Sequence, residues 1–247
     1  MRRTLERRAI PEALWQLTLA RYPFITRRTA ADLDQLRRLA TLFLDRKEFS
    51  GAGGMQVDDE VAVAVAAQAC LPILKLGLHR YDGFVGIVLH PDEVVAQRVV
   101  TDDDGVVHEY DETLSGEAMQ GGPVMLSWPD VQAAGELSAW AYNVVIHEFA
   151  HVLDMDSVAT LGPATAAYRS EHQGWLSDLI RKYSAFCVAV DAGEQTLVDP
   201  YGAESIEEFF AVCSEAFFVA PVELSQQRDG LYALMRTYYR QDPAAFH

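Results

Sequence analysis

The chain of 247 residues is 50% hydrophobic and 23% charged, which is sufficient for the core of one large domain or two small ones and excludes a disordered chain. Its formal net charge of −16 repels phosphate backbones, so binding of nucleic acid by the whole chain is disfavoured. The charge is unevenly placed, because residues 1–48 carry a net charge of +5 and residues 49–247 a net charge of −21.

Helical periodicity dominates the first 70 residues. A short helix is expected after Pro11, and a longer one is expected over 30–47, where leucines recur at three-to-four spacing. A Gly-rich turn at 50–54 precedes an Ala/Val-rich helix at about 58–70.

Between residues 71 and 128 the pattern changes to short β-branched runs separated by Gly, Pro and Asp, which predict four or five strands. The runs are 71–74, 84–90, 93–100, 105–110 and 123–128. The acidic turn at 102–105 is expected to be a solvated hairpin tip rather than a calcium loop, because the later ligands of an EF-hand loop are absent.

After Ser138 the helical period returns, with breaks around 157–164, 191–203 and 220–228. Runs of strands between runs of helices predict an α+β fold with a small mixed sheet packed with helices. We expect one domain over 1–247, in which 1–48 is a basic helical N-terminal segment that pairs with the acidic body or with a protein partner.

The compartment is predicted from cysteines and from missing export signals. Three scattered cysteines, Cys70, Cys187 and Cys213, are too few for a disulfide framework. The basic start lacks the apolar stretch of a signal peptide, and the longest apolar run, near 61–67, is shorter than the ~20 residues of a membrane helix. We therefore expect a cytoplasmic protein that has no membrane partner.

The most informative segment is a predicted helix, capped by Ser138, that contains His147, Glu148 and His151. Two histidines four residues apart project from one helix face and can ligate one zinc ion. In this HExxH pattern the metal lowers the pKa of a bound water and the glutamate takes the proton of that water. The alternative, a pair of core histidines bonded to carbonyl groups, is less favoured because helix, spacing and glutamate coincide.

A catalytic zinc site requires a third protein ligand. Glu171 lies twenty residues after His151, the spacing of thermolysin-like enzymes, but in a polar helix start. Glu208 is flanked by apolar residues, as a carboxylate entering a core would be, although with Ser205 it also forms a capping-box pattern. Glu207 and Glu215 are fallback ligands, either of which is more often a solvated or supporting carboxylate.

Several stretches together resemble the Mlc titration factor A family of bacterial zinc peptidases. They are RKEFSGAGG, AAQACLPIL, YDGFVGIVLHPDEV, GGPVMLSW, HEFAHVLDMD and DPYGAESIEEFFAVCSEAFF. The resemblance covers nearly the whole chain, and its catalytic part is also similar to the protease domain of anthrax lethal factor. It implies a zincin-like architecture in which the HExxH helix lies at the active site.

The resemblance also implies roles for residues. One Zn²⁺ per chain would be held by His147, His151 and Glu208, with Glu148 as general base and Tyr201 as a hydrogen-bond donor to the oxyanion. It further implies aminopeptidase-like activity on short peptides. A regulatory alternative is binding and titration of a transcriptional repressor of the Mlc type, in which peptidase activity is secondary or absent; neither reading requires direct contact with nucleic acid.

Two further expectations concern the surroundings of the site. Asp154, three residues after His151, either orients a ligand imidazole or pairs on the helix surface. The stretch 121–128 is a candidate edge strand that would pair with an extended peptide substrate, although most strands simply belong to a sheet.

Overall fold

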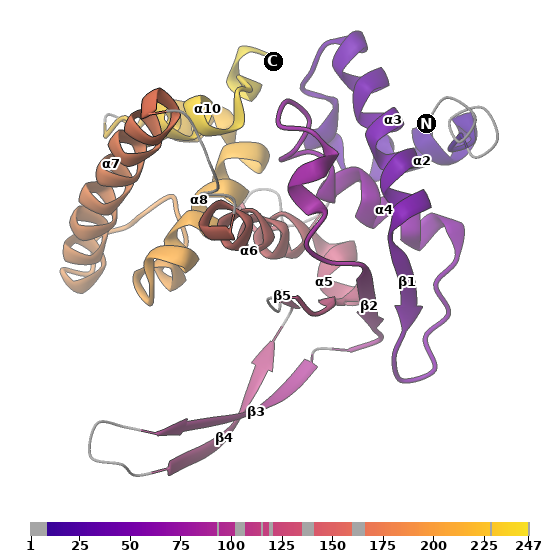
Figure 1. Ribbon diagram of the computed structural model, residues 1–247, viewed down its shortest axis with the longest axis horizontal. Coiled ribbons are helices and arrows are strands. Elements are labelled where there is room, and N and C mark those ends of the chain that lie inside the picture. The colour runs from indigo at the N-terminus through magenta and orange to yellow at the C-terminus, as the bar shows by residue number, and fades with distance from the viewer. Residues whose placement is uncertain are drawn as a thin grey trace.

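The computed structural model describes residues 9–92, 94–101, 107–114, 116–118, 121–134, 141–159, 166–227 and 229–246. It has helices in both halves and strands between them, as the sequence predicts (Figure 1). Among the described residues, no helix is both long and apolar enough to cross a membrane.

The N-terminal helices form part of the core. They are α2 (Glu12–Arg21), η1 (Pro23–Thr26), α3 (Ala30–Arg46) and α4 (Asp59–Ala69). The side chains of Tyr22, Ile25, Leu36 and Phe43 are completely buried, and both α2 and α3 pack on α4. The described part of the basic segment, residues 9–48, is therefore built into the core of the protein.

Four strands from residues 48–127 form one sheet, in which their order is β1-β2-β6-β5. Its strands are β1 (Glu48–Gly51), β2 (Gly86–His90), β5 (Gly116–Ala118) and β6 (Val124–Ser127). The pairs β1–β2 and β2–β6 are parallel and β5–β6 is antiparallel, so the predicted mixed sheet is confirmed.

One prediction about a strand is wrong, and of the two readings of 121–128 the ordinary one, a strand within the sheet, is confirmed. Residues 71–74 form turns after α4 and not a strand, because their apolar run is buried against helices rather than in the sheet. The candidate edge strand at 121–128 contains β6, which lies inside the sheet between β2 and β5. Of the described strands, β1 and β5 are the edges of this sheet.

A separate antiparallel ribbon lies between β2 and β5 in the chain. It consists of β3 (Val94–Thr101) and β4 (Val107–Leu114), paired from Val94–Leu114 to Thr101–Val107. This pairing is that of the predicted hairpin, whose tip at 102–105 lies outside the described residues.

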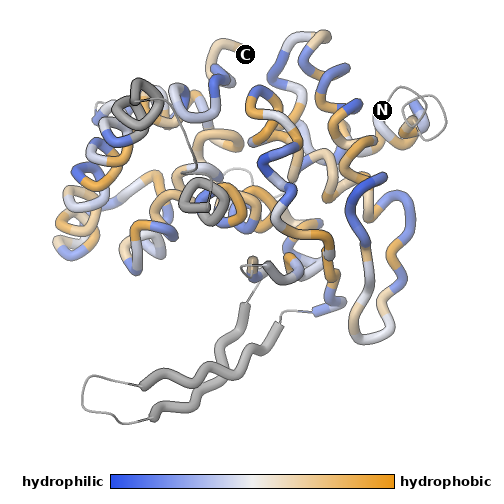
Figure 2. Tube along the Cα trace, in the orientation of Figure 1, coloured by the Kyte–Doolittle hydropathy of each residue, from blue (hydrophilic) through white to orange (hydrophobic). Residues whose placement is uncertain are grey.

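Helices α6 and α8 form the centre of the C-terminal half. The elements here are α5 (Trp128–Ala133), α6 (Val144–Ala159), α7 (Ala166–Asp191), η4 (Pro200–Ala203), α8 (Ile206–Val219), α9 (Pro221–Gln226), α10 (Leu231–Tyr239) and η5 (Pro243–Ala245), while η2 (Leu78–Tyr81) lies earlier in the chain, between α4 and β2. Figure 1 shows α6 between the N-terminal helices and sheet on one side and α7, α8 and α10 on the other. In Figure 2, hydrophilic and hydrophobic residues alternate along the coloured part of α7.

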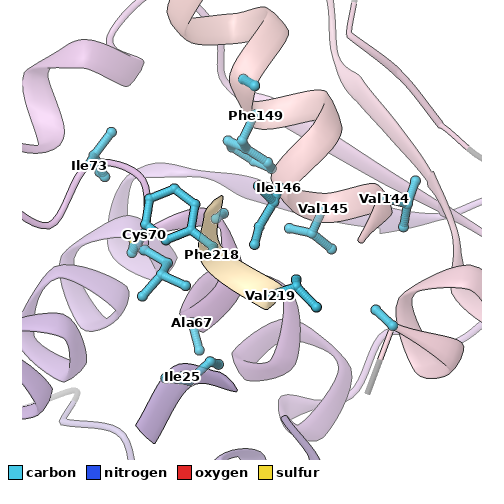
Figure 3. Close-up of a cluster of buried hydrophobic side chains, with 14 of the residues drawn as sticks. Ile25, Ala67, Cys70, Ile73, Val144, Val145, Ile146, Phe149, Phe218 and Val219 are labelled. Atoms are coloured by element: carbon cyan, nitrogen blue, oxygen red, sulfur yellow. The ribbon is translucent and has the colours of Figure 1, made fainter. Parts of the chain in front are cut away.

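The main core joins segments that are distant in sequence. Ile146 and Phe149 of α6 gather with Phe218 of α8 and with Ala67 and Cys70 at the end of α4 (Figure 3). All five side chains are completely buried. The α6 helix is thereby held from both sides, which fixes the direction of its remaining face.

Candidate metal centre

The HExxH helix begins at Val144, and the residue that caps it is Asn143. The Asn143 Oδ1 atom accepts a hydrogen bond from the Ile146 amide at 2.9 Å. The predicted start at Ser138 is wrong, because residues 141–143 are not helical; Ser138 itself lies outside the described residues. The late start places His147 in the first turn of α6.

The two histidines of the pattern face the same point. Their Nε2 atoms lie 3.2 Å apart, with ring centroids separated by 4.9 Å. This is the arrangement that the four-residue spacing predicts for one helix face.

Glu208 completes the cluster from α8. Its Oε2 lies 3.0 Å from His147 Nε2, and its Oε1 lies 3.4 Å from His151 Nε2. The capping pattern is also present, since Ser205 Oγ accepts a hydrogen bond from the Glu208 amide at 3.1 Å. The cap therefore uses the backbone of Glu208 and leaves its carboxylate directed at the histidines.

The donor atoms fit a tetrahedral metal ion. One ligand atom from each of His147, His151 and Glu208 lies within 4.8 Å of the others. Ligands at ~2.0–2.1 Å from one zinc ion, at tetrahedral angles, are about 3.4 Å apart. The observed separations of 3.0, 3.2 and 3.4 Å are close to that value.

The electrostatics of the cluster favour a cation at its centre. Burial acts to raise the pKa of Glu208, but hydrogen bonds with His147 and His151 outweigh it and lower the pKa to about 2. Burial acts to lower the pKa of His147, but hydrogen bonds with Glu208 and Glu215 outweigh it and hold the pKa well above its ordinary value. A proton or a metal ion between these atoms supplies the positive charge that both shifts require.

Glu148 lies beside the cluster under the edge strand β5. Its side chain is only 5% exposed, and burial raises its pKa to about 7. Gly116 of β5 covers it so closely that a Cβ atom at position 116 would be 2.7 Å from Cγ and Oε1 of Glu148. A carboxyl group with a pKa near neutrality, next to a metal-binding cluster, is suited to proton transfer.

Tyr201 lies near His147, in η4. Its ring centroid is 6.2 Å from that of His147, and its side chain is 40% exposed. The Asp199 side chain caps the turn by accepting a hydrogen bond from the Tyr201 amide at 2.9 Å. From α7, the Tyr183 hydroxyl donates to the Ala203 carbonyl at 3.1 Å, so the turn is held by its own cap and by α7.

The other predicted carboxylates have different positions. Glu215 is buried on α8 and accepts a hydrogen bond from His147 Nδ1 at 2.7 Å, so it supports the cluster without joining it. Glu207 is exposed. The side chain of Glu171 lies outside the described residues. Asp154 is half-buried on α6, and its role stays a prediction.

Sequence reasoning missed Asn143 and Gln68. The amide of Asn143 donates to Glu215 Oε2, and its side chain bonds Gln68 of α4. The only sequence signal was a polar residue in each of two otherwise apolar stretches.

An α+β fold with a His-His pair on one helix and a glutamate on a second is compatible with the zincin-like class of metallopeptidases. The family described as glucose-regulated metallo-peptidase M90 matches residues 1–240, and the chain belongs to this family. It is 34% identical over 233 residues to Mlc titration factor A of Salmonella arizonae, covering 94% of this chain and 92% of the relative.

Two further relatives show the same range of similarity. Mlc titration factor A of Salmonella choleraesuis is 33% identical over 93% of this chain and 86% of its own. A Synechocystis protein, slr2042, is 34% identical over 93% of this chain and 84% of its own. The resemblance predicted from the sequence is thus confirmed, and membership supports a metallopeptidase, a hydrolase that requires a metal ion.

Proposed function

We propose that the chain is a zinc-dependent peptidase. The convergence of His147, His151 and Glu208, whose ligand atoms lie within 4.8 Å of one another, is the observation that carries this proposal. The set of two imidazoles and one carboxylate is one that catalytic zinc uses, and it leaves a fourth position for water or substrate.

The chain's own residues have distinct parts in the proposed reaction. Zinc would supply Lewis acidity and lower the pKa of water at the site. Glu148 takes a proton from the attacking water and delivers it to the leaving amine, a role that suits a buried carboxyl group beside the metal ligands. Tyr201 donates a hydrogen bond to the oxyanion, a charge that develops only in the transition state.

The edge strand β5 is the proposed binding site for an extended peptide. It pairs with β6 on one side only in the described sheet, and Gly116 places it against Glu148. A peptide that adds to this edge would pass its scissile bond beside the base. We propose an aminopeptidase-like preference for short peptides with a free amino terminus, which rests on the family resemblance and is tested by comparing each peptide with its N-acetylated form.

Glu148→Gln tests the proposal most directly. The variant should retain one zinc per chain by elemental analysis and should lose peptide hydrolysis by 10²–10⁴-fold, because the glutamine cannot accept the proton. His147→Ala and Glu208→Ala should lose zinc. Full zinc in Glu208→Ala, together with loss of zinc in Glu171→Ala, would overturn the assignment of ligands.

Binding to a transcriptional repressor of the Mlc type is a second proposed function. It is favoured by the name of the Salmonella relatives, Mlc titration factor A. The two functions separate in cells: if Glu148→Gln leaves regulation intact, repressor binding is the dominant function. We propose that both functions take place in the cytoplasm. The three free cysteines agree with a reducing compartment.

A further inference from the structure

A chain of buried polar side chains connects α4 with the metal centre. The Gln68 Oε1 atom accepts a hydrogen bond from Asn143 Nδ2 at 2.7 Å. The backbone amide of Asn143 donates to Glu215 Oε2, and Glu215 Oε1 accepts from His147 Nδ1 at 2.7 Å. Gln68 and Asn143 are completely buried, and Glu215 is 3% exposed.

These hydrogen bonds allow only one assignment of donor and acceptor atoms to the two side-chain amides. Because Asn143 Oδ1 accepts from the Ile146 amide, its Nδ2 must be the group that donates to Gln68. Gln68 therefore presents Oε1 to Asn143, and its Nε2 donates to the Ala64 carbonyl at 3.2 Å. Every amide orientation in the chain is determined by a backbone group.

The geometry at Glu215 suits a metal-ligating His147. Glu215 Oε2 accepts from the Asn143 amide, and its Oε1 lies 2.7 Å from His147 Nδ1. A histidine that offers the Nε2 lone pair to a metal ion must carry its proton on Nδ1, and Glu215 is placed to accept a hydrogen bond from that position.

Burying these polar side chains costs free energy of folding unless their amide groups have hydrogen-bond partners. A buried amide without partners costs about 1–3 kcal/mol, and an apolar side chain at either position would avoid that cost. Gln68 lies among buried alanines and valines of α4, where a methionine would pack equally well by volume. Stability alone therefore does not explain why Gln68 is polar.

We propose that Gln68 and Asn143 are positioning residues of the metal centre, which act through Glu215 on His147. The inference rests on the proposed metallopeptidase function. Gln68 holds the Asn143 side chain at one end, while the α6 cap holds it at the other. The backbone amide of Asn143 is thereby fixed in the direction of Glu215.

The test compares two glutamine-to-methionine variants. Gln68→Met removes the acceptor for Asn143. Gln241→Met is the matched control, because Gln241 is also buried and donates to the Leu71 carbonyl at 2.8 Å but contacts no residue of the metal centre. Zinc dissociation constants are measured by competition with a chelator, together with the melting temperatures of the metal-free proteins.

We expect Gln68→Met to weaken zinc binding by about tenfold, at the lower end of the range for loss of a supporting partner of a metal ligand. Gln241→Met should bind zinc as the unmodified chain does, even where its melting temperature falls equally. Equal zinc affinity in the two variants overturns the inference. Absence of zinc binding by the unmodified chain would instead overturn the proposed function.

A second variant covers the case in which Gln68→Met does not fold. Asn143→Ser keeps a good helix cap and the backbone amide for Glu215, but it cannot bond Gln68. It should lose zinc affinity to the same extent. The double variant should lose no more than either single variant, because each of the three proteins lacks the same hydrogen bond between residues 68 and 143. Additive losses of zinc affinity, or unchanged affinity in Asn143→Ser, would contradict the proposal that Gln68 and Asn143 act together on the metal centre.

Discussion

Gly116 is the position at which a single methyl group should separate metal binding from catalysis. In Gly116→Ala, the new Cβ would lie 2.7 Å from Cγ and Oε1 of Glu148 and 2.9 Å from its Cδ. Ordinary contact begins at 3.4 Å, so Glu148 and β5 must separate by at least 0.7 Å. Because Glu148 is only 5% exposed, its carboxylate cannot avoid the new Cβ by turning into solvent.

The expected effects follow from that displacement. Overpacking costs typically 1–3 kcal/mol in the free energy of unfolding, and the flexible Glu148 side chain places this variant at the low end. Misplacement of a reacting group by about 1 Å can reduce kcat by about 10²-fold. Zinc content should remain one per chain, because the three atoms nearest to the new Cβ all belong to Glu148, which is not a ligand.

The assay measures zinc by elemental analysis, unfolding in urea, and kcat for a peptide substrate. The control is Gly174→Ala on α7, where a Cβ would meet nothing within 4 Å and helix formation should improve by about 0.5–1 kcal/mol. Full kcat in Gly116→Ala, with normal zinc, would refute the argument that β5 fixes the position of Glu148.

Three further predictions concern the same centre. Tyr201→Phe should lower kcat by about 10²-fold while zinc affinity and KM stay near those of the unmodified chain; an equal change in KM would contradict a role confined to the transition state. Ser205→Ala should cost about 1 kcal/mol of stability through loss of the α8 cap and should also weaken zinc binding, since Glu208 lies in the capped turn. Unchanged zinc affinity would contradict an effect of the cap on the metal site. In the metal-free protein, folding raises the pKa of Glu148 from 4.5 to about 7 and that of His147 above 6.5, so the folded state holds protons that the unfolded chain releases. The free energy of unfolding should therefore fall as the pH rises from 4.5 through 7, whereas zinc should remove this dependence; equal urea profiles for both forms across that range would contradict it.

The face of α6 that carries the site could be predicted because it depends on helical periodicity alone. His147 and His151 need only a helix and a spacing of four residues to meet. The start of that helix could not be predicted, since Ser138 and Asn143 are both good caps and the choice depends on tertiary bonds to Gln68 and Glu215.

Recognition of the third side chain of the cluster depended on more than local pattern. Glu171 and Glu208 both have acceptable sequence positions, and it is the packing of α8 against α6 that brings Glu208 to the histidines. The short strand β5 was missed for a related reason. Its glycine and small residues have low strand propensity, and the close approach to Glu148 that requires a glycine is visible only in three dimensions.

The uneven charge of the chain has a different meaning once the core is known. Residues 1–48 supply completely buried side chains, so removing them would expose the core and could not report on a partner. Their described charges partly pair on the surface: Arg37 pairs with Glu12, and Arg21 lies 3.1 Å from Glu60 of α4. Such exposed pairs contribute 0–1 kcal/mol each, so reversing the charge of Arg21 should leave the fold intact. Charge reversal on this surface, rather than truncation, is therefore the perturbation that separates partner binding by the basic segment from its part in the core.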